Sequence, residues 1–270
     1  MAGSLLAPGL LPGAAAGAAP LPASPQPGAP RGGWGTPAPP HPRWREQLAL
    51  IKGARAAGGA PVDTMGCEKC ADPAAPPAVR RFQTLVSLML SSQTKDEVVF
   101  AACQRLLALP GGFTPAGVAA APLAQLEALL YPVGFYRNKA KFVQAAGAHC
   151  AGALGGDIPD TVDALCELKG VGPKMAFICM HAAWGTNVGI GVDVHVHRIA
   201  NRLGWVKTEE PRATQAHLQE WLPRDEWEGL NVLLVGWGQT VCAAAKPRCE
   251  GCPVRAACPT GAGKAASLRA

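Results

Sequence analysis

Lys174 stands where its amine could act as a nucleophile. Gly170 and Gly172 allow a tight turn after a helix predicted over 160–168, and Pro173 suits the first position of a second helix over 173–184. Lys174 then falls in the first turn of that second helix, where the helix dipole disfavours a cation. Such a position favours the neutral amine that a nucleophilic lysine requires. The pattern alone leaves open a lysine that binds phosphate or is simply solvated.

The turn itself, Gly170-Val171-Gly172, is a second candidate site. Backbone amides that converge at the positive end of a helix bind phosphate well, and glycine lets the phosphate approach closely. The sequence therefore favours a phosphate-binding hairpin between two helices. An ordinary helix–helix connector is the alternative.

Asp193 follows Lys174 by nineteen residues and comes directly before a helix predicted over 194–203. At the N-cap of that helix, its carboxylate would stay ionised and could stabilise a developing cation or activate an amine. The alternative is that Asp193 only caps the helix. His195 and His197 are too badly spaced for one metal site, because residues two apart on a helix point to different sides.

The histidines share their stretch with two arginines, Arg198 and Arg202. We expect these four side chains at the surface or facing phosphate.

Four of the ten cysteines lie within seventeen residues, in the pattern C-x6-C-x2-C-x5-C. Sets of four thiolates hold either zinc or an iron–sulfur cluster, and structural zinc sites more often pair two short C-x2-C units. Lys246, Arg248 and Arg255 lie between these cysteines and would present cations outward, which suits phosphate contact. The predicted ligands are Cys242, Cys249, Cys252 and Cys258. Cys67 and Cys70 form another C-x2-C pair with no partner pair, and we predict no metal or redox function for them.

The elements that must position these residues are helices almost throughout. Apolar residues recur at helical spacing from Arg80 onward, and no long alternating run enriched in β-branched residues occurs. The fold class we predict is all-α. The first two predicted helices carry the stripes Phe82–Leu90 and Val98–Leu107, and the others span 123–131, 138–153, 160–168, 173–184, 194–203, 211–221 and 225–241.

The first 42 residues differ in composition from the rest. Eleven Pro, eight Gly and ten Ala leave this stretch too few large apolar side chains to build a core. No apolar run reaches the length of about 20 residues that a membrane helix needs, and no secretory signal is recognisable. We therefore expect a soluble protein with no membrane partner. The formal net charge of +6 hints at a polyanionic partner without establishing one.

In combination, these motifs resemble the endonuclease III family of helix-hairpin-helix DNA glycosylases, in its eukaryotic branch. The resemblance rests on LKGVGPK, VDVHVHR and the cysteine loop in this order, and on MLSSQTKDEV, YPVGFYRNK and VGWGQTVC. It covers about residues 63–260.

The resemblance implies a two-lobed all-α fold with DNA lying across the cleft between the lobes. A six-helix lobe would span 75–187 and carry the helix-hairpin-helix at 160–184. The lobe with a [4Fe–4S] cluster would join 45–74 to 188–262. The segments 1–44 and 263–270 would be tails, the first a possible targeting segment.

The resemblance also implies roles for single residues. Lys174 would be the catalytic lysine, Asp193 the catalytic aspartate, and the four C-terminal cysteines the cluster ligands. Gln93 would fill the gap left by an extruded base, and Phe135 would enter the stack as a wedge. Taken without the family, Gln93 is a loop glutamine and Phe135 a core aromatic.

The activity that the resemblance implies is that of a bifunctional DNA glycosylase and abasic-site lyase in base excision repair. Lys174 would form a Schiff base and β-elimination would follow, on double-stranded DNA that holds an oxidised pyrimidine, such as thymine glycol or 5-hydroxycytosine, or an abasic site. We expect a monomer in the nucleus, with the mitochondrion as a second location. The sequence departs from the family at Val194, usually Thr, and at Lys169, commonly Pro.

Two rival functions remain. A monofunctional glycosylase of the adenine-mispair type shares the cysteine spacing but lacks the lysine, so Lys174 argues against it. A non-catalytic DNA-binding module would not need Lys174 together with Asp193. A zinc site in place of the cluster would give a colourless protein.

Overall fold

The computed structural model describes residues 40–262, and all regular secondary structure in that range is helical. This confirms the all-α prediction, while the predictions for residues 1–39 and 263–270 lie outside the described residues. No described helix is both long and apolar enough to span a membrane. The α-helices are α1 (Trp44–Arg55), α2 (Pro61–Met65), α3 (Pro77–Ser91), α4 (Asp96–Leu106), α5 (Pro115–Ala120), α6 (Leu123–Leu130), α7 (Tyr136–Ala153), α8 (Val162–Glu167), α9 (Pro173–Trp184), α10 (Val194–Leu203), α11 (Pro211–Trp221) and α12 (Leu230–Thr240).

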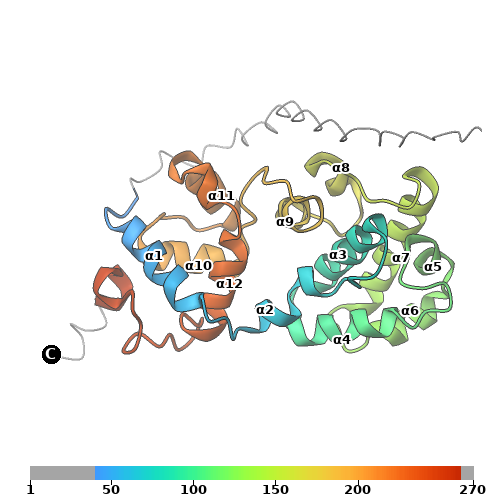
Figure 1. The fold of residues 1–270 in the computed structure, drawn as a ribbon, viewed down its shortest axis with the longest axis horizontal. Coiled ribbons are helices and arrows are strands. Elements are labelled where there is room, and N and C mark those ends of the chain that lie inside the picture. The colour runs from blue at the N-terminus through green and yellow to red at the C-terminus, as the bar shows by residue number, and fades with distance from the viewer. Residues whose placement is uncertain (1–39, 263–270) are drawn as a thin grey trace, which may run out of the picture.

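The helices gather around two hydrophobic cores, which give the molecule two lobes (Figure 1). Helices α3 to α9 surround the first core, in which Phe82 and Leu165 are fully buried. Helices α1 and α10 to α12 surround the second, around Trp205 and Trp237. The short helix α2 lies between the lobes and packs against both α4 and α12.

The predicted helix boundaries are met where the sequence has clear start and stop signals. Helices α9, α10 and α11 have the bounds predicted for them, since α9 and α11 begin on a proline and α10 on a capping aspartate. The last predicted helix is wrong at its start: α12 begins at Leu230, because Gly229 before it has the left-handed φ of 66°.

The six-helix count for residues 75–187 is also wrong, since seven α-helices lie there. The missed helix is α5, whose sequence PAGVAA has only Val118 as a large apolar residue and so shows no periodicity. Its start is marked instead by Thr114, whose hydroxyl accepts a hydrogen bond from the Gly117 N–H at 3.0 Å, and by Pro115 at the first helical position.

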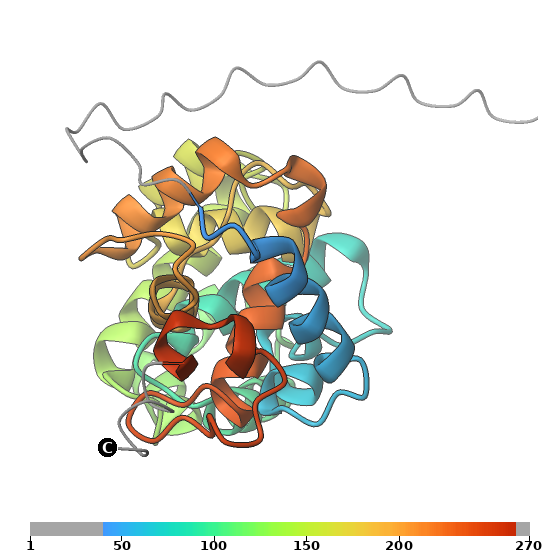
Figure 2. The same cartoon turned by 90° about the vertical axis from the view of Figure 1, so that its left-hand side faces the viewer.

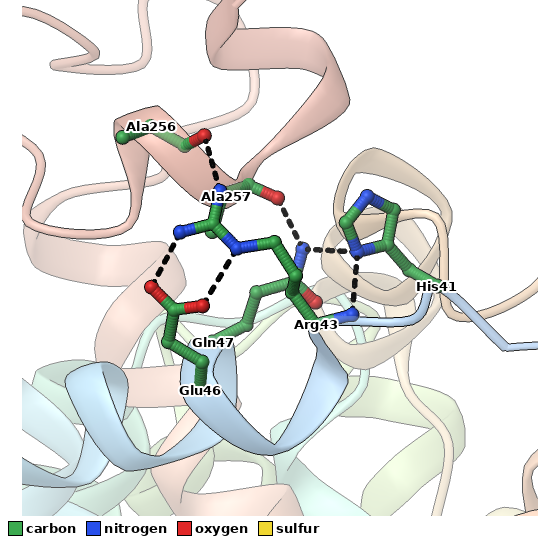
Figure 3. Close-up of polar contacts among 6 residues, drawn as sticks. All are labelled: His41, Arg43, Glu46, Gln47, Ala256 and Ala257. Carbon is green, nitrogen blue, oxygen red and sulfur yellow. Dashed lines mark hydrogen bonds and ion pairs between the residues drawn. The ribbon is translucent and has the colours of Figure 1, made fainter.

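The first described helix is joined to the last part of the chain (Figure 2). The fully buried amide of Gln47 on α1 donates to the Ala257 carbonyl at 2.7 Å and the Leu203 carbonyl at 3.0 Å. Arg43 donates to the Ala256 carbonyl at 3.0 Å and pairs with Glu46 (Figure 3). These contacts explain why residues more than 200 positions apart build one lobe.

Gln239 on α12 makes hydrogen bonds to both α2 and α4 where the two lobes meet. Its Nε2 donates to Asp96 Oδ2 at the start of α4 at 2.7 Å, and its Oε1 accepts from the Val62 N–H on α2 at 3.1 Å. The pKa of the Asp96 carboxyl is raised, because burial disfavours its charge and the Gln239 amide offsets only part of that cost.

Candidate functional site

The turn from α8 to α9 is a helix–hairpin–helix. Helix α8 is capped by Thr161, whose hydroxyl accepts from the Ala164 N–H at 3.3 Å. Gly170 has the left-handed φ of 90°, and a Cβ there would lie 2.6 Å from the Phe142 ring, so glycine is required.

Gly172 differs from Gly170 in both respects. Its φ of −106° suits any residue, so the backbone angles of the turn do not require glycine at this position. A Cβ on Gly172 would meet no atom within 4 Å, and the space in front of the turn is therefore open. The open space leaves room for a ligand at the N-terminus of α9.

Lys174 is the second residue of α9 and is partly buried. Its charge is close enough to lower the pKa of both Cys67 and His195 slightly, beside the larger effects of burial on these groups. Two groups outside α9 thus feel the charge of Lys174, one on η1 (Cys67–Lys69) and one at the start of α10.

Asp193 caps α10 with its side chain. Its Oδ1 accepts from the backbone N–H groups of His195 at 3.0 Å and Val196 at 2.8 Å, which is the cap that the sequence indicated. Two donors on one oxygen hold the carboxylate in a fixed orientation and leave Oδ2 without a described protein partner. The substituted neighbour Val194 is 66% exposed and so takes no part in fixing Asp193.

The pKa of His195 is shifted by several charged side chains of this region. Burial lowers its pKa most, while Asp193 and Asp96 raise it and Lys174 lowers it. Asp96 in turn feels both His195 and Asp193. Charges from α9, α10 and α4 thus act on one histidine where the two lobes meet.

The predicted surface or phosphate-facing role of the other basic residues on α10 is wrong for three of them. His197 Nδ1 hydrogen-bonds to Thr214 Oγ1 at 2.7 Å inside the second lobe. Arg198 donates to the Cys242 carbonyl at 3.1 Å. Arg202 donates to the carbonyls of Ala243 and Ala244, each at 2.7 Å, and lies 3.4 Å from Cys242 Sγ. These arginines hold the cysteine loop, and the sequence gives no signal of such long-range partners.

The four C-terminal cysteines line one pocket, together with Arg202, Trp237 and Val254. All four are partly buried. Burial raises the pKa of Cys252 and Cys258, and the neighbouring thiols raise both further, whereas a bound metal centre would favour the thiolate form of these ligands. Within residues 40–262, no three or more Cys, His, Asp or Glu side chains are arranged to hold a single metal ion. The four thiols of this pocket are the donors that could hold a metal centre.

The other candidate residues lie on the surface. Gln93 is exposed, and Phe135 is 64% exposed, which excludes a core position for this aromatic ring. Lys246 and Arg248 are exposed on the cysteine loop. Cys70 is buried in the first core, and burial raises the pKa of Cys67 far above its ordinary value, which makes a thiolate there unfavourable.

An open hollow of about 350 Å³ lies between the two lobes on the other end of α9. It is lined by polar and charged groups from both lobes, among them Lys52, Glu68 and His181. His181 follows Lys174 by two helical turns, so both residues lie on the same side of α9.

Comparisons with known proteins agree on one family. The HhH-GPD superfamily of base excision DNA repair proteins matches residues 86–224. Endonuclease III-like protein 1 of Bos taurus is 51% identical over 222 residues, which cover 82% of this chain and 72% of that protein. Endonuclease III homolog 1, chloroplastic, of Arabidopsis thaliana is 47% identical over 223 residues, which cover 80% and 58%.

A solved structure agrees with these sequence relatives. It is that of a trapped endonuclease III–DNA covalent intermediate, the estranged-adenine complex, with a TM-score of 0.70 and 27% identity. The match covers 82% of this chain and 96% of the other. A two-lobed helical fold with a helix-hairpin-helix, and relatives of this identity over most of both chains, place the protein in a family: the chain belongs to the endonuclease III family of the HhH-GPD superfamily.

Proposed function

We propose that this protein is a bifunctional DNA glycosylase and abasic-site lyase that removes oxidised pyrimidines from double-stranded DNA. Membership of the family gives DNA glycosylase activity in base excision repair. The observation that carries the finer proposal is that Lys174 is the second residue of α9 and that its charge acts on His195, two residues after the capping Asp193. A monofunctional glycosylase would need no amine at this place.

The first step is the displacement of the base. The target nucleotide leaves the stack, at a cost of a few kcal/mol that a damaged base reduces. The lone pair of neutral Lys174 attacks the sugar C1′, the C1′–N bond breaks, and the base departs with the bonding electron pair and takes up a proton. Asp193, whose Oδ1 is held by two N–H groups, stabilises the positive charge that develops on the sugar.

The second step is strand cleavage. In the amine–C1′ adduct the nitrogen lone pair then breaks the C1′–O4′ bond, O4′ takes up a proton and stays on C4′ as a hydroxyl, and the protonated Schiff base that forms acidifies the protons on C2′. Removal of one of these protons expels the 3′ phosphate and leaves a C2′=C3′ double bond, so the strand is cut on the 3′ side of the lesion. Water then hydrolyses the imine and frees Lys174. A carboxylate or the imidazole near the site can carry the proton.

The DNA-binding surface that we propose combines backbone amides with exposed side chains. The amides of Gly170, Val171 and Gly172 would bind a phosphate in the open space before α9. Gln93 and Phe135 would enter the base stack. Lys246 and Arg248 would add contacts to phosphates further along the backbone.

The pocket lined by the four cysteines would hold a [4Fe–4S] cluster. Four cysteine thiolates are the usual ligands of such a cluster, and these four side chains line one pocket. The cluster would join the last loop to α10 and thereby stabilise the second lobe. Arg202, at 3.4 Å from Cys242 Sγ, would be a hydrogen-bond donor to the cluster ligand.

Three further parts of the proposal start from the family. We propose a monomer that acts in the nucleus and in the mitochondrion. We also propose that the lobes divide the chain into 75–187 on one side and 45–74 with 188–262 on the other. The two hydrophobic cores support this division, although Cys70 packs with the first core and so lies on the opposite side of the boundary from its segment.

Borohydride trapping tests the mechanism. The protein is incubated with duplexes that hold thymine glycol, an abasic site or no damage, and the Schiff base is then reduced to a stable amine. We expect a covalent adduct with both damaged duplexes, none with Lys174→Gln, and an adduct with the control Lys169→Gln, which removes an exposed lysine from the same hairpin. Binding and base release without any adduct would favour a monofunctional glycosylase.

A further inference from the structure

Two residues of the described chain share an unusual backbone. Gln93, with φ of 51°, and Phe135, with φ of 57°, are the non-glycine residues of residues 40–262 that have positive φ. L-residues rarely adopt this region, because the Cβ comes too close to the backbone, so neighbouring contacts must hold it. Both side chains are exposed, so the contacts that hold this backbone must come from other residues.

The buried amine of Lys139 on α7 lies behind both loops. Lys139 is 6% exposed, which is rare for lysine. Its Nζ donates to the Leu90 carbonyl at 2.7 Å, the Ser92 carbonyl at 2.6 Å and Thr94 Oγ1 at 3.2 Å. Three ammonium donors thus meet three acceptors on the two sides of Gln93.

Burial lowers the pKa of Lys139 to about 8, and its described hydrogen-bond partners are all neutral oxygens. A lysine placed for general stability would be exposed or paired with a carboxylate. The Lys139 ammonium is desolvated, and its three N–H groups make three hydrogen bonds that only an ammonium can make together.

Thr94 extends these contacts to the second loop. Its hydroxyl donates to the Ser92 carbonyl at 3.1 Å and accepts from the Gly134 N–H, also at 3.1 Å. Gly134 directly precedes Phe135, and a Cβ on it would lie 2.8 Å from the Gln93 carbonyl oxygen. The two loops therefore touch backbone to backbone, and Lys139 and Thr94 fix one against the other.

We propose that Lys139 is a positioning residue that holds the Gln93 and Phe135 loops in the one arrangement from which both side chains can enter the DNA stack together. The inference rests on the proposed function, since it takes Gln93 as the gap filler and Phe135 as the wedge. Lys139 itself contacts neither DNA nor the reacting atoms. Its effect belongs to the extrusion of the base from a duplex and not to the chemistry at Lys174.

The test compares two substrates that differ in the need for extrusion. A duplex with thymine glycol must be opened by the two loops, whereas a single strand with an abasic site offers no partner strand and no base to expel. For Lys139→Met we expect KM on the duplex to rise by about tenfold or more with kcat changed less than about threefold, and lyase activity on the single strand to stay at the wild-type level. The matched control is Lys141→Met, which removes an exposed lysine from the same helix.

A second pair of variants keeps the test valid if Lys139→Met does not fold. Thr94→Val removes the hydroxyl that receives the Lys139 and Gly134 donors, and Thr94→Ser retains it. We expect Thr94→Val to reproduce the duplex defect and to speed hydrogen exchange of the Gly134 amide, and Thr94→Ser to restore both. The exchange measurement needs no enzyme activity and examines the hydrogen bond from the Gly134 N–H to Thr94 Oγ1 directly.

Both the kinetic result and the exchange result can overturn the proposal for Lys139. Equal losses on duplex and single strand, or a Thr94→Val variant with wild-type exchange at Gly134 and wild-type KM, would overturn the positioning role. A wild-type protein that cleaves neither substrate would overturn the proposed function, and the present inference with it.

Discussion

Replacing Gln47 with leucine should weaken the second lobe severely, although the two side chains are similar in size. Gln47 is fully buried, and besides its bonds to Ala257 and Leu203 its Oε1 accepts from the indole N–H of Trp205. Leucine would leave two carbonyls and one indole N–H buried without these partners. An unsatisfied buried group costs about 1–3 kcal/mol, and leucine regains part of this by burying apolar surface, so we expect a net loss of about 3 kcal/mol.

The assay is thermal unfolding followed by tryptophan fluorescence, since Trp44, Trp205 and Trp237 report on this lobe. For a protein of this size, each kcal/mol lost from the free energy of unfolding lowers Tm by about 2–4 °C, which gives a fall of about 6–12 °C for Gln47→Leu. Glu46→Gln, one residue away on the exposed surface, is the control and should leave Tm nearly unchanged. A fall below about 3 °C in Gln47→Leu would refute the reasoning, because the three groups would then have found other partners.

Three further outcomes can be checked with single variants. Gly170→Ala should lose about 2 kcal/mol or more of stability, because its φ is 90° and its Cβ would lie 2.6 Å from the Phe142 ring. Gly172→Ala should keep the wild-type Tm and weaken only DNA binding in a filter-binding assay, and equal Tm values for the two variants would contradict this. A hydrogen bond from Arg81 lowers the pKa of Asp157, so the pair stabilises the fold above the ordinary Asp pKa of about 3.9, and this contribution disappears as the pH falls through the lower folded pKa. Between about pH 5 and pH 3, Asp157→Asn should therefore lose less stability than the wild type in urea titrations, and equal losses would rule this out. Cys249→Ser should lose iron, melt at a lower temperature and bind DNA more weakly, and unchanged iron content together with unchanged melting would argue against the cluster.

Local signals in the sequence were sufficient for much of the fold. Pro173, Asp193 and Pro211 each mark a helix start, and the observed bounds follow them. The short α5 could not be found, because a six-residue helix has too few apolar positions to show a period.

The partners of charged side chains were the hardest part of the site to predict. Arg198 and Arg202 look like phosphate ligands in the sequence, yet their partners are carbonyls some 40 residues away, which no local pattern encodes. Lys139 is likewise one of several lysines in a basic stretch, and only its burial behind the Gln93 loop distinguishes it. The order of Lys174, Asp193 and the four cysteines, in contrast, is a property of the sequence itself, and it pointed to the family before any geometry was known.

The most direct test of the central claim is to map the borohydride-trapped adduct by peptide mass spectrometry. The wild-type protein is trapped on a duplex with thymine glycol, digested, and searched for the peptide that carries the residue of the sugar. The account predicts that the modified peptide contains Lys174 and that no other lysine is modified in comparable yield. An adduct on Lys169 or on the chain's N-terminal amine, with Lys174 unmodified, would contradict it.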